Sequence, residues 1–263
     1  MKIELIAHTQ LSEEFHDKYD KPGGHSGWDG NHLDDWGVED SQVVALAAIR
    51  CCYSPLKPSE IVAQEGEKYF GQSATDGEEG TEADRLIRHI VASKHTSTLE
   101  HITYTFAIEG VSRSLLAQLT RHRVGFSYSV QSQRYVRFGS DDKSGGFEYV
   151  TPESLEGKTT PVNIGGSPVY CGTATELYAS VMRGLQAAYD ELRKAGVPPE
   201  DARMILPNAA ACNIVMTVNL RALHDFYAKR KRGNGAQHEI SELAERLREE
   251  VVGVDPWTSK FFE

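Results

Sequence analysis

The sequence predicts a mixed α/β fold in a single domain. Segments with the alternation or β-branched content of strands occur near the start, the middle and the end of the chain, and amphipathic helical segments separate them. A chain of 263 residues is long enough to bury a substantial core. No internal repeat and no linker-like stretch divides it, so we predict one domain over residues 1–263.

The first half of the chain alternates between regular segments and polar loops. The first residues alternate polar and apolar side chains, which predicts a strand; no long apolar run follows, which argues against a signal peptide. Two later segments have apolar residues at helical spacing, and a third is rich in aromatic and β-branched residues. The predicted elements are a strand at 1–6, helices at 41–52 and 86–95, a strand at 102–108, and loops near 19–36 and 70–80.

The second half contains the clearest helix. Thr173 and Glu176 have the spacing of a capping box, and Gly196 followed by Pro198 ends the apolar pattern. Residues 139–171 carry Gly, Ser, Pro and Lys without periodicity and are interpreted as a surface excursion. The other predicted elements are helices at 112–122, 222–229 and 240–251 and a strand at 213–219.

Charge and cysteine content limit the possible ligands. The chain has 28 Lys and Arg against 38 Asp and Glu, a net charge of −10, which makes non-specific nucleic-acid binding unfavourable. An anionic ligand must therefore be held by a local basic cluster. No apolar run is long enough to span a membrane, and the four cysteines form no CxxC pair, which indicates a reduced cytoplasmic protein. No His or Cys spacing matches a zinc site, so no metal is predicted, and Cys51 and Cys52 are interpreted as small packing residues.

Basic residues are concentrated between positions 118 and 137. Arg121, His122 and Arg123 are consecutive, and Arg134 and Arg137 follow. Gln118 lies one helical turn before Arg121 and His122, so these side chains are expected to share a face. The intervening residues supply hydroxyls, an amide and a glycine but no carboxylates, a composition that favours an anion such as a phosphate. The alternative is a solvated basic face paired with the acidic surplus elsewhere.

Several segments together resemble the flavin-dependent thymidylate synthases, also called the thymidylate synthase complementing family. Arg121-His122-Arg123 followed by Ser132-Gln133-Arg134-Tyr135 resembles the family signature. Three further blocks occur in the family's order, and the resemblance covers roughly residues 41–255. These blocks are His95-Thr96-Ser97-Thr98-Leu99-Glu100-His101, Ala202-Arg203-Met204-Ile205-Leu206-Pro207, and Thr217-Val218-Asn219-Leu220-Arg221 with Arg230 downstream.

The resemblance implies a fold, an assembly and a reaction. It implies a mixed or antiparallel central sheet with helices, and a homotetramer whose active sites lie at subunit interfaces. The implied reaction is the reductive methylation of dUMP to dTMP in dTMP biosynthesis. Methylenetetrahydrofolate would provide the carbon, FAD would carry the hydride and NADPH would reduce the flavin. Because hydride transfer to uracil C6 replaces attack by a cysteine, the protein needs to polarise the pyrimidine.

The matching positions also imply site residues. Arg230 is expected to favour ionisation at uracil N3 and His95 to lie at the flavin ring, so these two are the predicted catalytic residues. Ser132 has no evident general base nearby in sequence and is given a binding role. The predicted FAD-binding residues are Ser97, Glu100, Arg121, His122, Arg123, Asn219, Leu220, Arg221 and Asp225. The predicted dUMP-binding residues are Gln118, Arg121, Gln131, Ser132, Gln133, Arg134, Arg203 and Arg230.

The sequence departs from the family pattern at a few positions. The signature has one extra residue near Val124 and Gly125, Thr98 replaces a common proline, and Ala117 replaces a common arginine. The segment after Arg230 is also one residue longer and lacks a histidine, so Lys231 and Arg232 are alternatives to Arg230 for its role. For Arg203, the alternative to nucleotide binding is a structural ion pair. The rival functional class is an RNA- or nucleotide-binding module that would stack bases on Phe126, Tyr128 and Tyr135.

Overall fold

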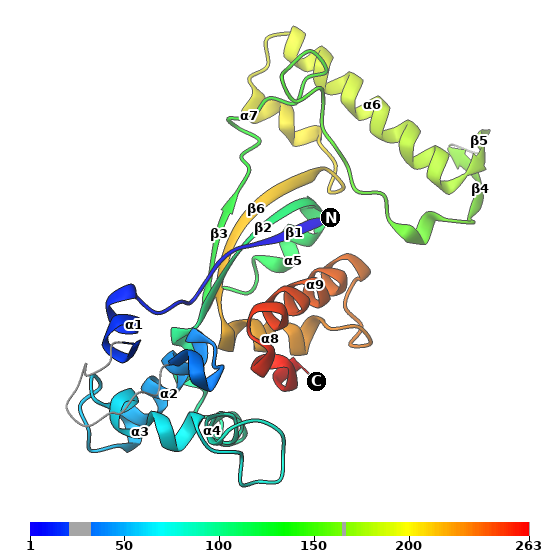
Figure 1. Ribbon diagram of the computed structural model, residues 1–263. Coiled ribbons are helices and arrows are strands. Elements are labelled where there is room, and N and C mark those ends of the chain that lie inside the picture. The colour runs from blue at the N-terminus through cyan, green and yellow to red at the C-terminus, as the bar shows by residue number, and fades with distance from the viewer. Residues whose placement is uncertain (21–32, 165–166, 263) are drawn as a thin grey trace. The chain divides into compact units, whose positions relative to one another are not determined.

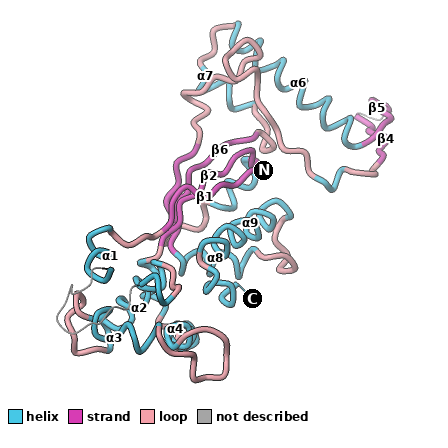
Figure 2. The backbone as a smooth tube through the Cα atoms, in the orientation of Figure 1, coloured by secondary structure: helices cyan, strands magenta, loops and turns pink. Residues whose placement is uncertain are grey.

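The chain has the predicted mixed α/β character. The computed structural model describes residues 1–20, 33–164 and 167–262, which form both strands and helices (Figures 1 and 2). It divides into two compact units. Unit 1 comprises Met1–Ile3, Ala107–His122 and Tyr128–Val215, and unit 2 comprises Glu4–Phe106, Arg123–Ser127 and Met216–Glu263. The single-domain organisation stays a prediction.

A four-stranded sheet contributes strand residues to both units. Its order is β1 (Lys2–His8), β2 (Thr103–Ser112), β6 (Ala211–Asn219) and β3 (Phe126–Val130). The strands predicted at 1–6, 102–108 and 213–219 are confirmed. Strand β3 lies in the basic segment, where no strand is predicted from the sequence. It is only five residues long and carries serines on its exposed face, so its apolar signal is weak.

Unit 2 is mainly helical. Helices α2, α3 and α4 lie together in Figure 1 and share a buried cluster that includes Leu46, Val62 and Phe70. A second anchor is the buried carboxylate of Asp255, which accepts hydrogen bonds from the Ser41 and Tyr104 hydroxyls. The α-helices and 3-10 helices (η) of unit 2 are α1 (Glu13–Asp20), η1 (Leu33–Trp36), α2 (Asp40–Tyr53), α3 (Ile61–Phe70), α4 (Glu82–Ala92), η2 (Thr96–His101), α8 (Leu220–Arg230), α9 (His238–Val254) and η5 (Pro256–Phe262).

The sequence interpretation of unit 2 holds for most elements. The helices predicted at 41–52, 86–95, 222–229 and 240–251 correspond to α2, α4, α8 and α9, and the 70–80 segment is a loop. Helices α1 and α3 are not predicted, and residues 19 and 20 of the predicted loop belong to α1. Of the loop predicted near 19–36, residues 33–36 form η1, and residues 21–32, which include His25, Trp28 and His32, lie outside the described residues.

Two cysteines of unit 2 correct the sequence interpretation. Cys51 and Cys52 are exposed thiols on the last turn of α2 rather than buried packing residues. The buried face of this helix is formed by Val43, Leu46 and Ile49, and it ends before the cysteines. None of the helices in the described ranges combines the length and the apolar character needed to cross a membrane.

Unit 1 is organised around one long helix. The predicted capping box begins α6: the Thr173 Oγ1 accepts from the Glu176 N–H at 3.2 Å, and the Glu176 carboxylate accepts from the Thr173 N–H at 2.9 Å. Phe138, Tyr189 and Ala202 form the buried centre of a cluster beside this helix. The remaining elements of unit 1 are α5 (Arg113–Leu119), η3 (Glu153–Leu155), β4 (Thr159–Ile164), β5 (Ser167–Thr173), α6 (Ala174–Lys194), α7 (Pro199–Ala202) and η4 (Arg203–Ile205).

Two predictions for unit 1 are wrong in part. The 139–171 segment is not wholly irregular, because β4 and β5 pair as an antiparallel hairpin. The helix predicted at 112–122 ends at Leu119, and Thr120 is its C-cap. Arg121 and His122 therefore lie in the turn after α5 and do not continue the helical face of Gln118.

Candidate functional site

The start of α8 is the best-defined part of the candidate site in unit 2. Asn219 is the N-cap of this helix, and its side-chain oxygen accepts from the Ala222 N–H at 2.8 Å. The Asn219 backbone N–H donates to the Gly125 carbonyl at 3.0 Å, and the Leu220 N–H donates to the Ile102 carbonyl at 2.9 Å. The helix start is thereby tied to the end of η2 and to the loop that carries Arg123.

Gly125 approaches α8 more closely than any other residue type could. Its φ is +75°, and a Cβ built there would lie 2.6 Å from the Ala222 Cβ and 2.7 Å from the Asn219 Nδ2. A side chain would meet both the strained backbone conformation and the clash. The glycine loop, where the sequence predicts the extra residue of the signature, packs on a helix N-terminus beside the exposed Arg123.

Glu100 and Arg221 form an ion pair at the same junction. The Glu100 Oε1 lies 2.5 Å from the Arg221 Nη1, and the two side chains are 43% and 44% exposed. The pair joins η2 to the first turn of α8, although the two residues are 121 positions apart. Asp225, one turn further along α8, and Ser97 in η2 are exposed. Five predicted FAD-binding residues therefore lie on η2 and the first half of α8: Ser97, Glu100, Leu220, Arg221 and Asp225.

His95 has a partner that the sequence interpretation does not identify. The Tyr53 hydroxyl lies 2.6 Å from the His95 Nδ1, and the two rings meet edge to face at 5.7 Å. Tyr53 is the last residue of α2, so only the tertiary fold brings it to His95. This contact fixes the orientation of the imidazole and leaves its Nε2 for another partner.

Arg230, Lys231 and Arg232 occupy different positions. Arg230 is the last residue of α8 and is half-buried, while Lys231 is the C-cap. Arg232 is exposed, and its backbone N–H donates to the Glu245 carboxylate at 3.3 Å. The three cations that compete in the sequence are thus distinguished by their position at the end of the helix.

In unit 1, Tyr128 supports the turn that presents Arg121 and His122. Its hydroxyl lies 3.0 Å from the Leu119 carbonyl and 2.8 Å from the His122 carbonyl, and burial raises the pKa of this phenol. The His122 N–H also donates to the Leu119 carbonyl at 3.0 Å. Tyr128 therefore fixes the backbone of the turn, a role that its position in the signature does not reveal.

The segment after β3 is held by backbone and hydroxyl contacts. The Gln131 N–H donates to the Asn213 carbonyl at 2.9 Å, which joins this segment to β6. The Ser132 hydroxyl oxygen accepts from the Arg134 N–H at 3.2 Å, and Gln133 is buried. Ser132 is therefore part of a turn, an arrangement that suits a positioning or binding role.

Glu200 connects Arg134 and Arg203, which are both predicted to bind dUMP. Its carboxylate lies 2.6 Å from the Arg134 Nε, and its backbone carbonyl accepts from the Arg203 Nε at 3.0 Å. The Arg134 and Glu200 side chains are 57% and 46% exposed. Arg134 also lies over the Tyr135 ring, 5.4 Å from its centre. Two arginines thus contact one residue at the start of α7, Arg134 through the Glu200 carboxylate and Arg203 through the Glu200 backbone carbonyl, which no sequence motif indicates.

The predicted site residues separate between the units. Unit 2 contains His95, Ser97, Glu100, Arg123, Asn219, Leu220, Arg221, Asp225 and Arg230. Unit 1 contains Gln118, Arg121, His122, Gln131, Ser132, Gln133, Arg134 and Arg203. Most of the predicted FAD-binding residues are therefore in unit 2, and all the predicted dUMP-binding residues except Arg230 are in unit 1.

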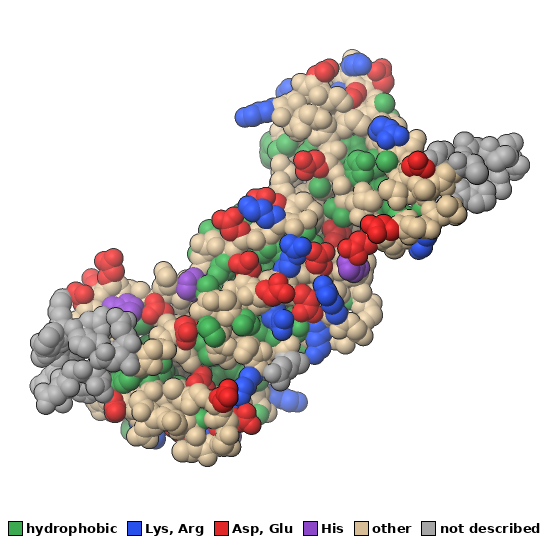
Figure 3. All heavy atoms as spheres, turned by 45° about the vertical axis from the view of Figure 1, so that its right-hand side comes forward, with side chains coloured by type: hydrophobic (Ala, Val, Ile, Leu, Met, Phe, Trp, Pro, Cys, Tyr) green, Lys and Arg blue, Asp and Glu red, His purple; other side chains and the backbone are tan. Residues whose placement is uncertain are grey.

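The surface charges and the aromatic residues can be compared with what the rival function, an RNA- or nucleotide-binding module, would require. On the face shown in Figure 3, acidic and basic side chains are interspersed. Phe126 packs edge to face on Phe226 at 6.0 Å, and the Tyr128 hydroxyl is engaged in its turn, so only Tyr135 of the three proposed stacking rings is exposed. Within the described ranges, no group of His, Cys, Asp and Glu side chains is arranged to hold a metal ion.

Comparisons with known protein sequences all identify the same family. The family model described as "Thymidylate synthase complementing protein" matches residues 33–257. A flavin-dependent thymidylate synthase of Geobacter sulfurreducens is 38% identical over 217 residues, which are 81% of this chain and 78% of the relative. The corresponding enzyme of Haloarcula marismortui is 37% identical over 190 residues, 68% of this chain and 75% of the relative.

Solved structures show the same fold. The flavin-dependent thymidylate synthase ThyX of Helicobacter pylori, complexed with FAD and dUMP, superposes with a TM-score of 0.61 at 21% identity. That alignment covers 100% of this chain and 98% of the other. The UMP/dUMP methylase PolB of Streptomyces cacaoi, bound with 5-Br dUMP, also has a TM-score of 0.61 at 21% identity, over 99% and 93% of the two chains.

Proposed function

The chain belongs to the thymidylate synthase complementing protein family, and from this we propose that it is a flavin-dependent thymidylate synthase that methylates dUMP to dTMP with FAD. The structural observation that carries the proposal is the junction of Gly125, Asn219 and α8. A glycine-lined helix N-terminus beside exposed arginines is suited to a dinucleotide that carries a diphosphate.

The residues of unit 2 fit FAD. The positive dipole end of α8 favours an anion, and the absence of a Cβ at Gly125 lets the loop that carries Arg123 pack directly against this helix start. Arg221 and Arg123 are exposed beside this helix start and would bind the diphosphate, while Ser97, Asn219, Leu220 and Asp225 would position the rest. FAD, when bound, supplies the hydride for the reaction.

The residues of unit 1 fit a nucleoside monophosphate. Arg134 contacts the Glu200 carboxylate and Arg203 the Glu200 backbone carbonyl, so both guanidinium groups lie beside the same residue. We propose that a phosphate replaces the Glu200 carboxylate at Arg134 and that Arg203 supplies a second donor. Gln118, Arg121, His122 and the Gln131–Gln133 segment supply further donors, with Arg121 and His122 also proposed to contact FAD.

Arg230 is proposed to activate the pyrimidine. A guanidinium beside N3 stabilises the negative charge that develops on the ring without losing its own proton. His95, oriented by Tyr53, would use its Nε2 to hold or move a proton near the flavin. Glu100 holds Arg221 in place, which is a positioning role.

Three further parts of the proposal rest on the family alone. Methylenetetrahydrofolate is proposed as the carbon donor and NADPH as the reductant. We also propose a homotetramer whose active sites lie at subunit interfaces, so that residues from different copies of the chain complete one site.

A reduced, cytoplasmic environment is proposed on other grounds, because Cys51, Cys52 and Cys212 are free thiols.

An absorption spectrum followed by flavin oxidation tests the function. The purified protein is expected to be yellow. Its flavin, reduced by NADPH without oxygen, should be reoxidised by methylenetetrahydrofolate only when dUMP is present, with dTMP as the product. A protein that does not bind FAD, or reoxidation that is independent of dUMP, would contradict the proposal.

A pair of variants tests the assignment of the FAD half. Arg221→Ala removes the exposed guanidinium at the start of α8 and should lower the FAD content of the purified protein. Arg246→Ala is the matched control, because Arg246 also forms an ion pair with a glutamate, at 2.6 Å on α9, but is not a predicted site residue. Equal loss of FAD in both variants would show that Arg221 acts through general stability.

A further inference from the structure

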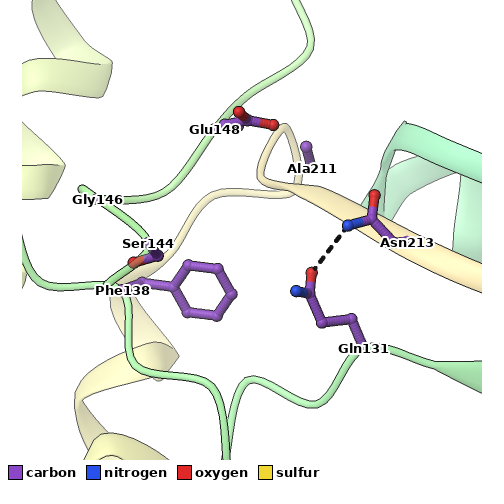
Figure 4. Close-up of a pocket in the computed structure, with 7 residues that line it drawn as sticks. All are labelled: Gln131, Phe138, Ser144, Gly146, Glu148, Ala211 and Asn213. Atoms are coloured by element: carbon purple, nitrogen blue, oxygen red, sulfur yellow. Dashed lines mark hydrogen bonds between the residues drawn. The ribbon is translucent and has the colours of Figure 1, made fainter. Parts of the chain in front are cut away.

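Unit 1 contains a cavity whose lining residues, with one exception, lie outside the proposed FAD and dUMP sites. Its volume is about 190 Å³, and it lies between the Gln131 end of β3, the start of β6 and the loop after Phe138 (Figure 4). Gln131 is the only lining residue among the predicted site residues; the others are Phe138, Ser144, Gly146, Glu148, Ala211 and Asn213.

The cavity walls are fixed by hydrogen bonds to β6 and α6. The Gln131 N–H donates to the Asn213 carbonyl at 2.9 Å, and the Ala211 N–H donates to the Glu148 carbonyl at 2.8 Å. Alternate residues of a strand face the same side, so Ala211 and Asn213 both line the cavity. Gln186 of α6 joins the remaining walls, since it donates to the Phe138 carbonyl at 2.9 Å and accepts from the Phe147 N–H at 2.8 Å.

A chain of hydrogen bonds determines which end of the Gln131 amide faces the cavity. The Gly110 backbone N–H can only donate, and it lies 3.1 Å from Asn213 Oδ1. The Asn213 Nδ2 must then point to Gln131, where it donates to Oε1 at 3.4 Å. The Gln131 NH₂ group is left on the side of the Phe138 ring, as Figure 4 shows. The cavity therefore receives a fixed pair of N–H donors.

The other walls supply an acceptor and an apolar face. The Glu148 side chain is exposed and lines the cavity, so its carboxylate is available to accept two hydrogen bonds. The Phe138 ring lies beside the Gln131 amide (Figure 4) and is only 7% exposed, in the cluster with Tyr189 and Ala202, so its position is rigid. Ser144 donates to the Arg137 carbonyl at 2.8 Å, which leaves its oxygen as a further acceptor.

From this arrangement we infer that the cavity binds a planar ring with a 2-amino-4-oxopyrimidine edge, the edge shared by guanine and pterins. The adjacent ring N–H and 2-amino group would donate to the two oxygens of Glu148, and the oxo group would accept from Gln131. The Phe138 ring would contact the face of the ligand. A bidentate, charge-assisted contact of this kind is both strong and selective.

The geometry distinguishes this edge from related ones. Hypoxanthine has the ring N–H but no 2-amino group, so one carboxylate oxygen would have no donor. Uracil has one N–H between two carbonyls, and its second carbonyl would face the second carboxylate oxygen. Adenine presents a ring acceptor where the carboxylate needs a donor. Only the guanine-type edge satisfies both oxygens.

Binding of three nucleoside monophosphates and one pterin measures this selectivity. Titration calorimetry of the protein loaded with FAD and saturated with dUMP, so that the proposed dUMP site is already filled, should show binding of GMP or, separately, of pterin-6-carboxylate. IMP and UMP are expected to bind at the same site at least tenfold more weakly. A response to GMP alone identifies a guanine nucleotide. A response to the pterin alone identifies a pterin compound; because the proposed carbon donor is such a compound, that reading also rests on the proposed function.

Substitution of Glu148 tests the assigned residue. Glu148→Gln removes the charge and one of the two acceptors, and should weaken the ligand roughly 10- to 100-fold. Glu156→Gln, the same change at an exposed residue of unit 1 outside the cavity, should leave affinity unchanged. FAD content should be unaffected in both variants, and dUMP-dependent flavin oxidation should be slower in Glu148→Gln only if the ligand is the pterin carbon donor. Loss of the inferred site would therefore leave FAD binding intact, which separates this inference from the proposed function. The inference is overturned if GMP and the pterin both fail to bind at millimolar concentration, if IMP or UMP binds as tightly, or if Glu148→Gln has no effect.

Discussion

The two units hold their parts of the candidate site by different means. In unit 2 the centre of the site is a backbone junction, with the exposed Glu100–Arg221 pair beside it: Gly125 packs on α8, and Asn219 both caps that helix and binds the glycine loop. In unit 1 the arginines are held by exposed side-chain contacts, of which the Arg134–Glu200 pair is the clearest. Backbone contacts are costly to change, whereas an exposed ion pair exchanges readily. We therefore expect the FAD half to be preformed and the dUMP half to adjust when its ligand binds.

The largest expected effect comes from Arg230, the one predicted dUMP-binding residue outside unit 1. If it stabilises charge on the pyrimidine, Arg230→Ala should lower turnover about 100- to 1000-fold, the usual cost of removing one such donor, and should keep the bound flavin. Single-turnover flavin oxidation and the flavin spectrum measure the two properties. Lys231→Ala and Arg232→Ala are the neighbouring controls, and wild-type turnover in Arg230→Ala would transfer the role to one of them.

Gly125 tests the claim that unit 2 is built from backbone contacts. Gly125→Ala introduces a Cβ at φ +75° that would lie 2.6 Å from the Ala222 Cβ. Backbone strain and overpacking together should cost about 2–4 kcal/mol of unfolding free energy and displace the loop, so FAD content should fall as well.

The control separates the two contributions. Gly77 has a φ of +83° and no neighbour within 4 Å, so Gly77→Ala should show the backbone cost alone, about 1 kcal/mol, with normal FAD content. Urea unfolding and the ratio of flavin to protein absorbance give both values. Equal losses in the two variants would show that the close packing of Gly125 on α8 is unimportant.

The sequence predicts the local elements well where the pattern and the caps agree. The Thr173–Glu176 box marks the start of α6 because the capping contacts depend on residues only three positions apart. Strand β3 and the β4–β5 hairpin are not predicted, because short strands with serines, prolines and glycines carry little apolar alternation. Strand β3 pairs with the distant strand β6, whereas β4 and β5 pair with each other.

Prediction of the candidate site has the same limit: residues within local motifs are predicted, and their distant partners are not. The family blocks identify most of the residues by type and order, but the partners of those residues lie far away in the sequence. Tyr53 is 42 positions from His95, and Glu200 lies 66 positions after Arg134. No periodicity or motif relates such pairs, so only the tertiary structure reveals which side chains orient the predicted ones.

Tyr128 provides a smaller test in unit 1. Tyr128→Phe removes the hydroxyl that contacts the Leu119 and His122 carbonyls, and should cost about 1 kcal/mol of unfolding free energy. Tyr178→Phe removes a similar hydroxyl contact, 2.9 Å to the Val150 carbonyl, and should cost about the same. Only Tyr128→Phe should also weaken dUMP binding, because it loosens the turn of Arg121. Unchanged dUMP affinity would place that turn outside the nucleotide site.

The smallest expected effect is the most direct test of an adjustable dUMP half. Glu200→Gln keeps the backbone carbonyl that accepts from Arg203 but removes the charge that competes with phosphate for Arg134. An exposed pair of this kind contributes at most about 1 kcal/mol, so dUMP should bind about two- to fivefold more tightly. Glu191→Gln is the matched control, because Glu191 pairs with Lys194 at 2.9 Å on α6, away from the predicted residues. Weaker dUMP binding in Glu200→Gln would mean that Glu200 positions Arg134 for the nucleotide. Unit 1 would then be preformed, as unit 2 is.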